Sequence, residues 1–239
     1  MSVYKIIIII LVLCELIFTG LFLKVSSAGF SKKSLILKTL CSAIFVIICL
    51  TAALSENNTG SLYFRLILSG LVFSLIGDFM LHRDNNIPLY ITGGLCFVSA
   101  HIFYIISFIK TQSAIIGKTQ IITLRDLFGI LGIPAVFALL HPLMKLKPGK
   151  LTGPVFVYSA FLGFMLIKAI NLGLELINLS NLKAALFIIC GALLFTVSDF
   201  TLGLGFFGEN TKSKKYTNII TYYSGQILLA ISTAFVVSA

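Results

Sequence analysis

Long apolar segments recur along the whole chain, and they limit its possible folds more than any other feature. A helix needs roughly 20 mostly apolar residues to cross the hydrocarbon core of a bilayer. Eight segments meet this requirement, at residues 4–23, 35–54, 62–81, 88–109, 124–144, 152–171, 183–207 and 217–237. Their apolar runs are continuous and do not alternate with polar residues, so they predict spanning helices and not barrel strands.

The overall composition supports the same conclusion. The chain of 239 residues is 58% hydrophobic and 11% charged, and its mean hydropathy is +1.06. A soluble domain of this size cannot bury so much apolar surface, so lipid must be the solvent for most of it. We expect an all-α membrane protein, a bundle of eight transmembrane helices that forms one domain over residues 1–239. As an integral, multi-pass protein, it is expected in the plasma membrane.

The N-terminal segment admits a second interpretation. A basic start, an apolar run and the small residues VSSA (25–28) are also the parts of a secretory signal. However, the apolar run of about 18 residues is longer than the apolar region usual in such signals. Lys24 also interrupts the segment that follows. We therefore interpret residues 4–23 as the first spanning helix.

The positive charges indicate an orientation. The formal net charge is +10, but the basic residues lie in short connections between apolar segments, so we do not expect a nucleic-acid partner. The side of the N-terminus carries six: Lys5, Arg65, Lys110, Lys118, Arg125 and Lys183. The opposite side carries eleven: Lys24, Lys32, Lys33, Lys38, Arg83, Lys145, Lys147, Lys150, Lys212, Lys214 and Lys215. Because basic connections tend to stay in the cytoplasm, we expect both termini on the non-cytoplasmic side.

Two aspartates interrupt the apolar segments. Asp78 lies in FSLIGDFMLH (73–82), and Asp199 lies in LLFTVSDFTLGLGFF (193–207). An acidic side chain at the centre of a spanning helix costs about 2.5–3.5 kcal/mol on insertion, so it usually faces the bundle interior. Both aspartates lie in the cytoplasmic half of their segments, and we expect the two carboxyl groups to face one cavity. The alternative for each is a helix–helix hydrogen bond or a position at the membrane surface.

The two aspartates have similar neighbours. IGDFML (76–81) and VSDFTL (197–202) share a small residue, then Asp, Phe and, two positions on, Leu. They lie on the third and seventh segments, which run in the same direction. This similarity favours two four-helix halves in a parallel repeat, related by an axis along the membrane normal.

Further polar side chains lie within the apolar segments. They are Lys38, His101, Tyr104, Tyr158, Tyr222, Tyr223 and Gln226. The tyrosines are also typical of an aromatic belt, and Gln226 of a helix–helix hydrogen bond. Lys38 is also typical of a lysine whose ammonium group extends to the membrane surface. Glu15 lies in the middle of the first segment, and the sequence suggests no partner for it.

Five short motifs resemble those of a known family. They are Gly77–Asp78, AHIFY (100–104), VYSAFLGFML (157–166), GALLFTVSD (191–199) and TYYSGQILLA (221–230). In this order and at this spacing they resemble the YhhN-like, lysoplasmalogenase family, from the second segment to the eighth. The chain departs from the family pattern at Lys38-Thr39-Leu40, because the family tends to have proline after the lysine.

The resemblance implies a membrane-embedded hydrolase that cleaves the vinyl ether bond of lysoplasmalogens. The products would be a fatty aldehyde and glycerophosphoethanolamine or glycerophosphocholine. Vinyl ethers are cleaved by acid: a proton adds to the β-carbon, and water captures the resulting oxocarbenium ion. Such a reaction needs one carboxylic acid that stays protonated and one carboxylate that stays charged, as in glycosidases. We expect no cofactor and no metal, and the partners would be a lysophospholipid and the bilayer.

The resemblance and the local sequence together suggest roles for the site residues. We expect Asp199, which has Phe195 and Phe200 as neighbours, to be the proton donor, and Asp78 to stay ionised. The groups that bind substrate or surround the acids would be Lys38, Arg83, His101, Tyr104, Tyr158, Ser198, Tyr222, Tyr223 and Gln226. Lys38 and Arg83 are placed to bind the lipid phosphate through charge-assisted hydrogen bonds.

Three other classes of function stay open. Acids within a repeated helical bundle are also typical of small-molecule or proton-coupled transporters. The position of both acids near one face disfavours a transporter, as does the restriction of Pro134 and Pro142 to the fifth segment. A metal-dependent hydrolase is disfavoured because the three histidines lack a metal-binding spacing. A structural or receptor role is the third alternative.

Overall fold

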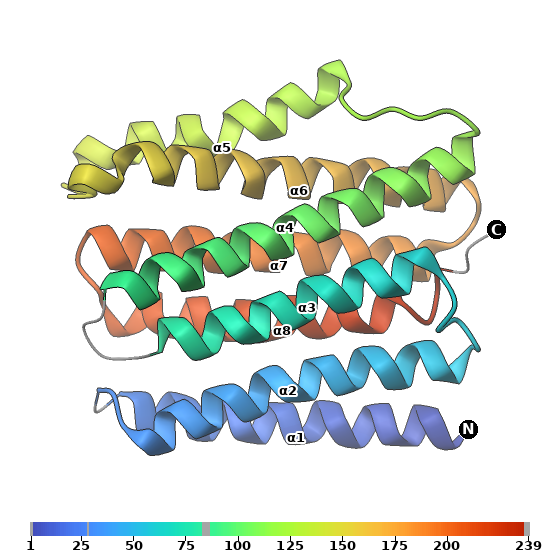
Figure 1. Cartoon of the computed structure of the whole chain (residues 1–239), viewed down its shortest axis with the longest axis horizontal. Coiled ribbons are helices and arrows are strands. Elements are labelled where there is room, and N and C mark those ends of the chain that lie inside the picture. The colour runs from blue at the N-terminus through green and yellow to red at the C-terminus, as the bar shows by residue number, and fades with distance from the viewer. Residues whose placement is uncertain (1, 28, 83–86, 237–239) are drawn as a thin grey trace. The chain divides into compact units, whose positions relative to one another are not determined.

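The computed structural model describes residues 2–27, 29–82 and 87–236 (Figure 1). These residues form eight α-helices and one short 3-10 helix, η1, and contain no strand. The α-helices are α1 Val3–Ser26, α2 Lys32–Ser55, α3 Leu62–Leu81, α4 Ile87–Ile116, α5 Leu124–Leu143, α6 Thr152–Asn178, α7 Leu182–Phe207 and α8 Lys212–Ser232, with η1 at Gly149–Leu151. The expected all-α class is therefore confirmed.

The predicted helix bounds agree best with the structure where the apolar sequence and the helix end at the same residue. The third segment matches α3 at both ends. In contrast, α4 and α6 each continue seven residues past their predicted ends at 109 and 171. The predictions were too short there because they followed apolarity, whereas a helix continues through polar residues that suit it. The last helix begins and ends five residues before its predicted bounds, 217–237, and residue 237 lies outside the described residues.

Seven of these helices, α1 to α7, are long and apolar enough to cross a membrane. The exception among the described helices is α8, because its first half carries polar side chains. They include Lys212, Lys214, Lys215 and Asn218. The predicted count of eight spans is therefore reduced to seven candidates by length and composition. The sidedness of the termini and the parallel repeat both stay predictions.

Polar residues between the spans begin several helices. Ser31 and Ser34 form a capping box at the start of α2, in which each side chain accepts a hydrogen bond from the other's backbone N–H. Ser61 caps α3 through the N–H of Phe64, and Asn181 caps α7 through that of Ala184. These caps satisfy N–H groups that the first turn of a helix leaves without intrahelical partners.

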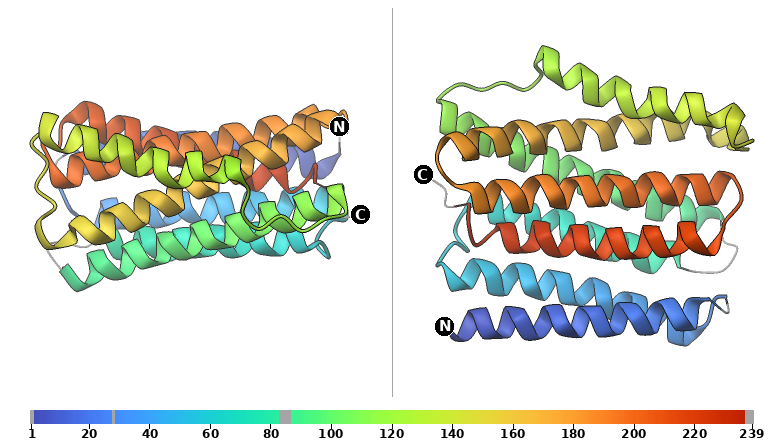
Figure 2. Two further views of the ribbon diagram at one scale, coloured as in Figure 1. Left: turned by 90° about the horizontal axis from the view of Figure 1, so that it is seen from above. Right: turned by 180° about the vertical axis from the view of Figure 1, so that it is seen from behind.

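The chain divides into two compact units. Unit 1 comprises the described residues within Met1–Ser107 and Gln226–Ala239. In this unit α1, α2 and α3 alternate in direction, and α2 packs against both of the others (Figures 1 and 2). The C-terminal turn is held by Asn58, whose Nδ2 donates to the carbonyl oxygens of Thr233 and Val236, at 2.9 and 2.5 Å. The prediction of a single domain stays a prediction.

Unit 2 comprises residues Phe108–Gly225. Here α6 packs against both α5 and α7. The contact with α5 is very close at one point, because a Cβ atom added to Gly163 would lie 1.9 Å from the carbonyl oxygen of Gly129. Glycine at such positions lets two helix backbones approach each other.

Candidate functional site

Asp78 is buried near the C-terminal end of α3, with 2% of its surface exposed. Two side chains of α2, one turn apart, bind its two carboxyl oxygens. Lys38 Nζ lies 3.1 Å from Oδ1, and Ser42 Oγ donates a hydrogen bond of 2.6 Å to Oδ2. An ammonium group within hydrogen-bonding distance favours a charged carboxylate. That Asp78 is ionised stays a prediction.

A histidine lies at the same end of unit 1. His82 follows α3 as its C-terminal cap, and its Nε2 lies 2.8 Å from Ser34 Oγ at the start of α2. The imidazole ring contacts Phe22 edge-on, with ring centres 5.3 Å apart, and also contacts Phe30. The end of α3 is thus joined to the first turn of α2 by a polar contact, and to α1 and the connection before α2 by aromatic contacts.

Glu15 of α1 is also buried in unit 1, with 1% of its surface exposed. Thr19, one turn further along α1, lies 3.5 Å from Glu15 Oε1 and 3.8 Å from the Cys41 thiol of α2. Cys41 directly precedes Ser42, which binds Asp78. Thr19 thus connects Glu15 to Cys41, the residue before Ser42. Glu15 therefore belongs to the polar cluster around Asp78.

A second polar chain in unit 1 joins three helices. Tyr104 of α4 donates a hydrogen bond of 2.9 Å to Gln226 Oε1 of α8. Gln226 Nε2 in turn donates to Ser74 Oγ, at 3.1 Å, one turn before Asp78 on α3. His101 is fully buried one turn before Tyr104. The structure thus brings together Tyr104 and Gln226, two of the predicted site residues.

Asp199 of α7 lies in unit 2 and is 6% exposed. Its Oδ2 accepts a hydrogen bond from the hydroxyl group of Tyr158 on α6. The preceding residue, Ser198, is bound by Asn218 of α8, whose Nδ2 donates to the serine hydroxyl at 2.9 Å and to its carbonyl oxygen at 3.0 Å. The aspartate therefore lies where α6, α7 and α8 contribute polar groups.

The predicted tyrosines of α8 lie in the aromatic core of unit 2. Tyr222 packs edge-on against Phe195 of α7, with ring centres 5.8 Å apart, and against Tyr223, at 4.9 Å. Both tyrosines are buried. A glycine lets α8 approach α7 here, because a Cβ atom on Gly225 would lie 2.8 Å from the backbone nitrogen of Phe195. These two tyrosines therefore pack inside the helical unit and do not only form part of an aromatic belt at the membrane surface.

The structure pairs six predicted site residues with one another: Lys38 with Asp78, Tyr158 with Asp199, and Tyr104 with Gln226. Arg83 lies outside the described residues. Asp78 and Asp199 belong to different units, so their predicted common cavity stays a prediction.

Sequence reasoning missed three residues that bind predicted ones or their neighbours. Ser42 binds Asp78, Ser74 binds Gln226, and Asn218 binds Ser198. Ser42 and Lys38 are separated by four positions on one helix, so they lie on the same face. Ser74 and Asp78 have the same separation, as do Asn218 and Tyr222. Small polar residues one turn from a predicted site residue are the signal that could have found all three.

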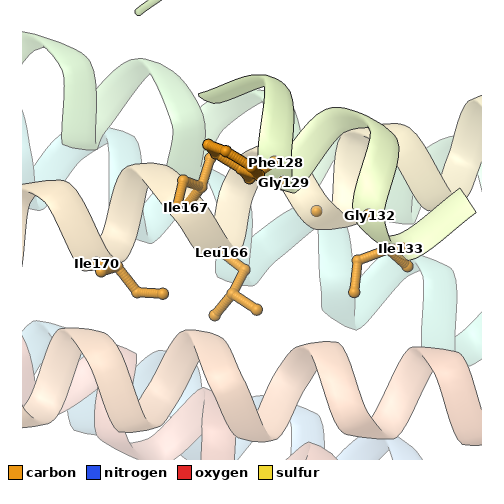
Figure 3. Close-up of a pocket in the computed structure, with 8 residues that line it drawn as sticks. Phe128, Gly129, Gly132, Ile133, Leu166, Ile167 and Ile170 are labelled. Atoms are coloured by element: carbon orange, nitrogen blue, oxygen red, sulfur yellow. The ribbon is translucent and has the colours of Figure 1, made fainter. Parts of the chain in front are cut away.

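A shallow apolar pocket of about 190 Å³ lies between α5 and α6 in unit 2 (Figure 3). Its lining residues are Phe128, Gly129, Gly132, Ile133, Gly163, Leu166, Ile167 and Ile170. None of these side chains can donate or accept a proton. The pocket is suited to an acyl chain or to bilayer lipid, and it offers no group for acid catalysis.

The apolar helices and the buried carboxyl groups define an all-helical, multi-pass membrane protein with polar clusters inside its helical units. Comparison of sequences then identifies the family. The model of the YhhN family matches residues 33–233, and the chain belongs to this family. It is an integral membrane protein of multiple spans. The family match includes both aspartates but begins after α1.

Two curated relatives carry the same name. The chain is 32% identical to lysoplasmalogenase TMEM86A of Bos taurus and 33% identical to lysoplasmalogenase TMEM86A of Homo sapiens, in each case over 167 residues. Each match covers 70% of this chain and 64% of the relative's own length. No solved structure matches the chain.

Proposed function

We propose that the chain is a lysoplasmalogenase-like hydrolase that cleaves the vinyl ether bond of lysophospholipids in the membrane. The observation that supports this proposal most directly is the buried Asp78 carboxylate, held by Lys38 and Ser42. A buried acid with a dedicated cation is costly to insert into a membrane, and such residues mark functional sites. The relatives named lysoplasmalogenase supply the substrate class.

The chemistry of the substrate explains why carboxyl groups would be used. Protonation of the alkenyl β-carbon moves the double-bond electrons into the new C–H bond and leaves an oxocarbenium ion. Addition of water and loss of a proton produce a hemiacetal, which separates into an aldehyde and an alcohol. A fixed carboxylate such as Asp78 stabilises the cation electrostatically and orients the water. The reaction consumes one water and changes no oxidation state overall.

Asp199 lies in unit 2, and the role proposed for it rests on the sequence. Its hydrogen bond from Tyr158 fixes the orientation of the carboxyl group on α7. The sequence-based assignment makes Asp199 the proton donor. The polar residues around it, Ser198 and Asn218, would hold the α7 backbone in place and not react themselves.

Lys38 is proposed to have two roles. Its ammonium group pairs with Asp78, and 17% of its side chain is exposed. An ammonium group has three donors, so it can bind a phosphate oxygen while it keeps its carboxylate partner. This places the polar head group of the substrate at the partly exposed side of Lys38 and the alkenyl chain among apolar side chains.

The direct test is aldehyde release by purified protein in lipid nanodiscs. We expect the wild type to release fatty aldehyde from a lysoplasmalogen and nothing from the saturated alkyl-ether analogue, which cannot be protonated at carbon. Asp78→Asn should lower turnover by about 10²–10⁴-fold, the range of general acid–base and electrostatic contributions. Glu56→Gln changes an exposed acid of the same unit and serves as the matched control.

Binding of the alkyl-ether analogue separates loss of chemistry from loss of structure. A folded Asp78→Asn protein that binds the analogue but releases no aldehyde supports the proposal. A wild-type protein that binds lysophospholipid without releasing aldehyde would contradict it, and so would normal turnover by the variant.

A further inference from the structure

Glu15 is the carboxyl group whose surroundings differ most from those of the two aspartates. It lies in α1, which the family match does not include. One oxygen, Oε1, is within 3.5 Å of the Thr19 hydroxyl. The other, Oε2, is buried and has no hydrogen-bond partner among the described residues. Both Asp78 and Asp199, in contrast, accept a short hydrogen bond from a neighbouring hydroxyl group.

Burial in this form favours a protonated glutamic acid. An ionised carboxylate with an unpartnered oxygen loses its hydration and gains nothing in exchange, which costs several kcal/mol. The ammonium group of Lys38 pairs with Asp78. A second negative charge near Asp78 would also be repelled. A proton on Oε2 removes the buried charge and this repulsion, while Oε1 still lies 3.5 Å from the Thr19 hydroxyl.

Cys41 shows how near the two acids lie. Its thiol lies 3.8 Å from the hydroxyl group of Thr19, which is the contact of Glu15. The next residue, Ser42, donates to Asp78. Two consecutive residues of α2 therefore contact the partner of Glu15 on α1 and Asp78 on α3.

We propose that Glu15 is the proton donor of the vinyl ether cleavage and that Asp78 is its charged partner. This inference rests on the proposed function and deepens it. It needs only residues of unit 1, and it replaces the sequence-based assignment of Asp199 as donor. Environment divides the two roles between the acids: Lys38 and Ser42 hold one as a carboxylate, and apolar burial holds the other as an acid.

The cleavage of the vinyl ether needs no reactant other than water. The Glu15 proton adds to the alkenyl β-carbon, and the electron pair of the C=C bond forms the new C–H bond. The substrate becomes an oxocarbenium ion, and Glu15 becomes a carboxylate. Water then adds to the cationic carbon and gives one proton back to Glu15. The resulting hemiacetal separates into the fatty aldehyde and glycerophosphoethanolamine or glycerophosphocholine. Glu15 is then a protonated acid again.

The position of α1 provides a route for the lipid. The helix packs against α2 (Figure 1). It also carries exposed apolar residues, among them Leu16 and Ile17, which follow Glu15 in the sequence. An acyl chain in the bilayer therefore contacts α1 directly.

The first experiment compares Glu15→Gln, Glu15→Asp and Asp199→Asn in the aldehyde assay, with Glu56→Gln as the control. Glutamine keeps the size of the side chain and removes the proton that is transferred. We expect Glu15→Gln to lose at least about 100-fold in turnover while it binds the alkyl-ether analogue as tightly as the wild type. Glu15→Asp, which is still an acid, should retain measurable turnover. Wild-type turnover by Glu15→Gln, with loss in Asp199→Asn, would overturn the proposal and favour Asp199 as donor.

The second experiment does not depend on activity. Infrared difference spectra of wild type minus Glu15→Gln at neutral pH should contain the carbonyl stretch of a buried protonated carboxyl group, and wild type minus Glu56→Gln should lack it. Absence of that band in the first spectrum would overturn the proposal, because an ionised Glu15 has no proton to donate. If the band is present but the wild type releases no aldehyde, then the proposed function has failed and Glu15 remains a neutral acid.

Discussion

Lys168 is fully buried within α6. Its Nζ lies 2.7 Å from Asp126 Oδ2, and Asp126 is equally buried at the start of α5. Asn171 donates to the other oxygen of Asp126, at 3.0 Å, and the N–H of Thr123 donates to the first at 2.6 Å. This network satisfies both charges and joins the first turn of α5 to the middle of α6.

Removal of one partner should be costly here. Lys168→Met leaves the Asp126 carboxylate buried without its cation, and we expect a loss of about 3–5 kcal/mol in the free energy of unfolding. Denaturant titration of the protein in detergent measures this loss. The double variant Lys168→Met/Asp126→Leu should recover most of the stability, because neither charge is then left alone.

The exposed pair of Lys5 and Glu56 is the control for this experiment. Its atoms lie 3.7 Å apart with both side chains largely exposed. Lys5→Met should therefore change the stability by less than about 1 kcal/mol. Equal effects of Lys168→Met and Lys5→Met on the free energy of unfolding would show that the buried network stabilises the protein no more than an exposed ion pair does.

At the scale of helices, the contact between α5 and α6 depends on two glycines. The backbones approach so closely at Gly129 and Gly163 that there is no space for a methyl group on Gly163. Gly132, one turn along α5 in the same pocket, has open space around its missing Cβ. The pair of positions therefore allows a matched comparison.

Gly163→Ala should separate α5 from α6 and destabilise the protein by about 1–3 kcal/mol through overpacking. Gly132→Ala should leave the thermal unfolding temperature unchanged or slightly higher, since alanine favours helix and meets no neighbour. Thermal unfolding of the two variants in detergent measures the difference. Equal stability of Gly163→Ala and Gly132→Ala would contradict the close approach of the α5 and α6 backbones at Gly163.

The helix lengths have a related explanation. Apolar segments predicted the existence of α1 to α7, because a bilayer selects for such runs. They did not predict the last seven residues of α4 or of α6, which contain polar side chains such as Gln112 and Glu175. Those turns are helical because of local backbone preference and packing, and neither leaves a hydropathy signal.

For the whole molecule, orientation in the membrane is the prediction that the charges support. The excess of basic residues predicts that the connection before α8 lies in the cytoplasm and both termini lie outside, which requires α8 to cross the membrane as well. In a variant without the five natural cysteines, we expect Asn57→Cys to react with an impermeant thiol reagent in intact cells. Ser213→Cys should react only after the membrane is permeabilised. The reverse pattern would invert the orientation, and the proposed head-group side would then face outwards.

The candidate site was predictable in part. A charged side chain within a membrane is costly and usually functional, and this argument pointed to Asp78, Asp199 and Lys38. The same reasoning noted Glu15 but found no partner, although Thr19 lies one turn further along the same helix. Partners such as Ser42 and Asn218 are common residues with no unusual sequence context, so only their positions in space distinguish them.

The sequence by itself determined the solvent, the helical class and the family, because continuous apolar runs and ordered motifs are local properties of the chain. It also determined which side chains needed a partner. Only the tertiary structure decided which partner each one has. Lys38 binds Asp78 across 40 positions and Lys168 binds Asp126 across 42, and such pairs depend on how helices pack and not on any local pattern. The physical reason is that a charge within a helix is satisfied by whatever the neighbouring helix presents at the same depth.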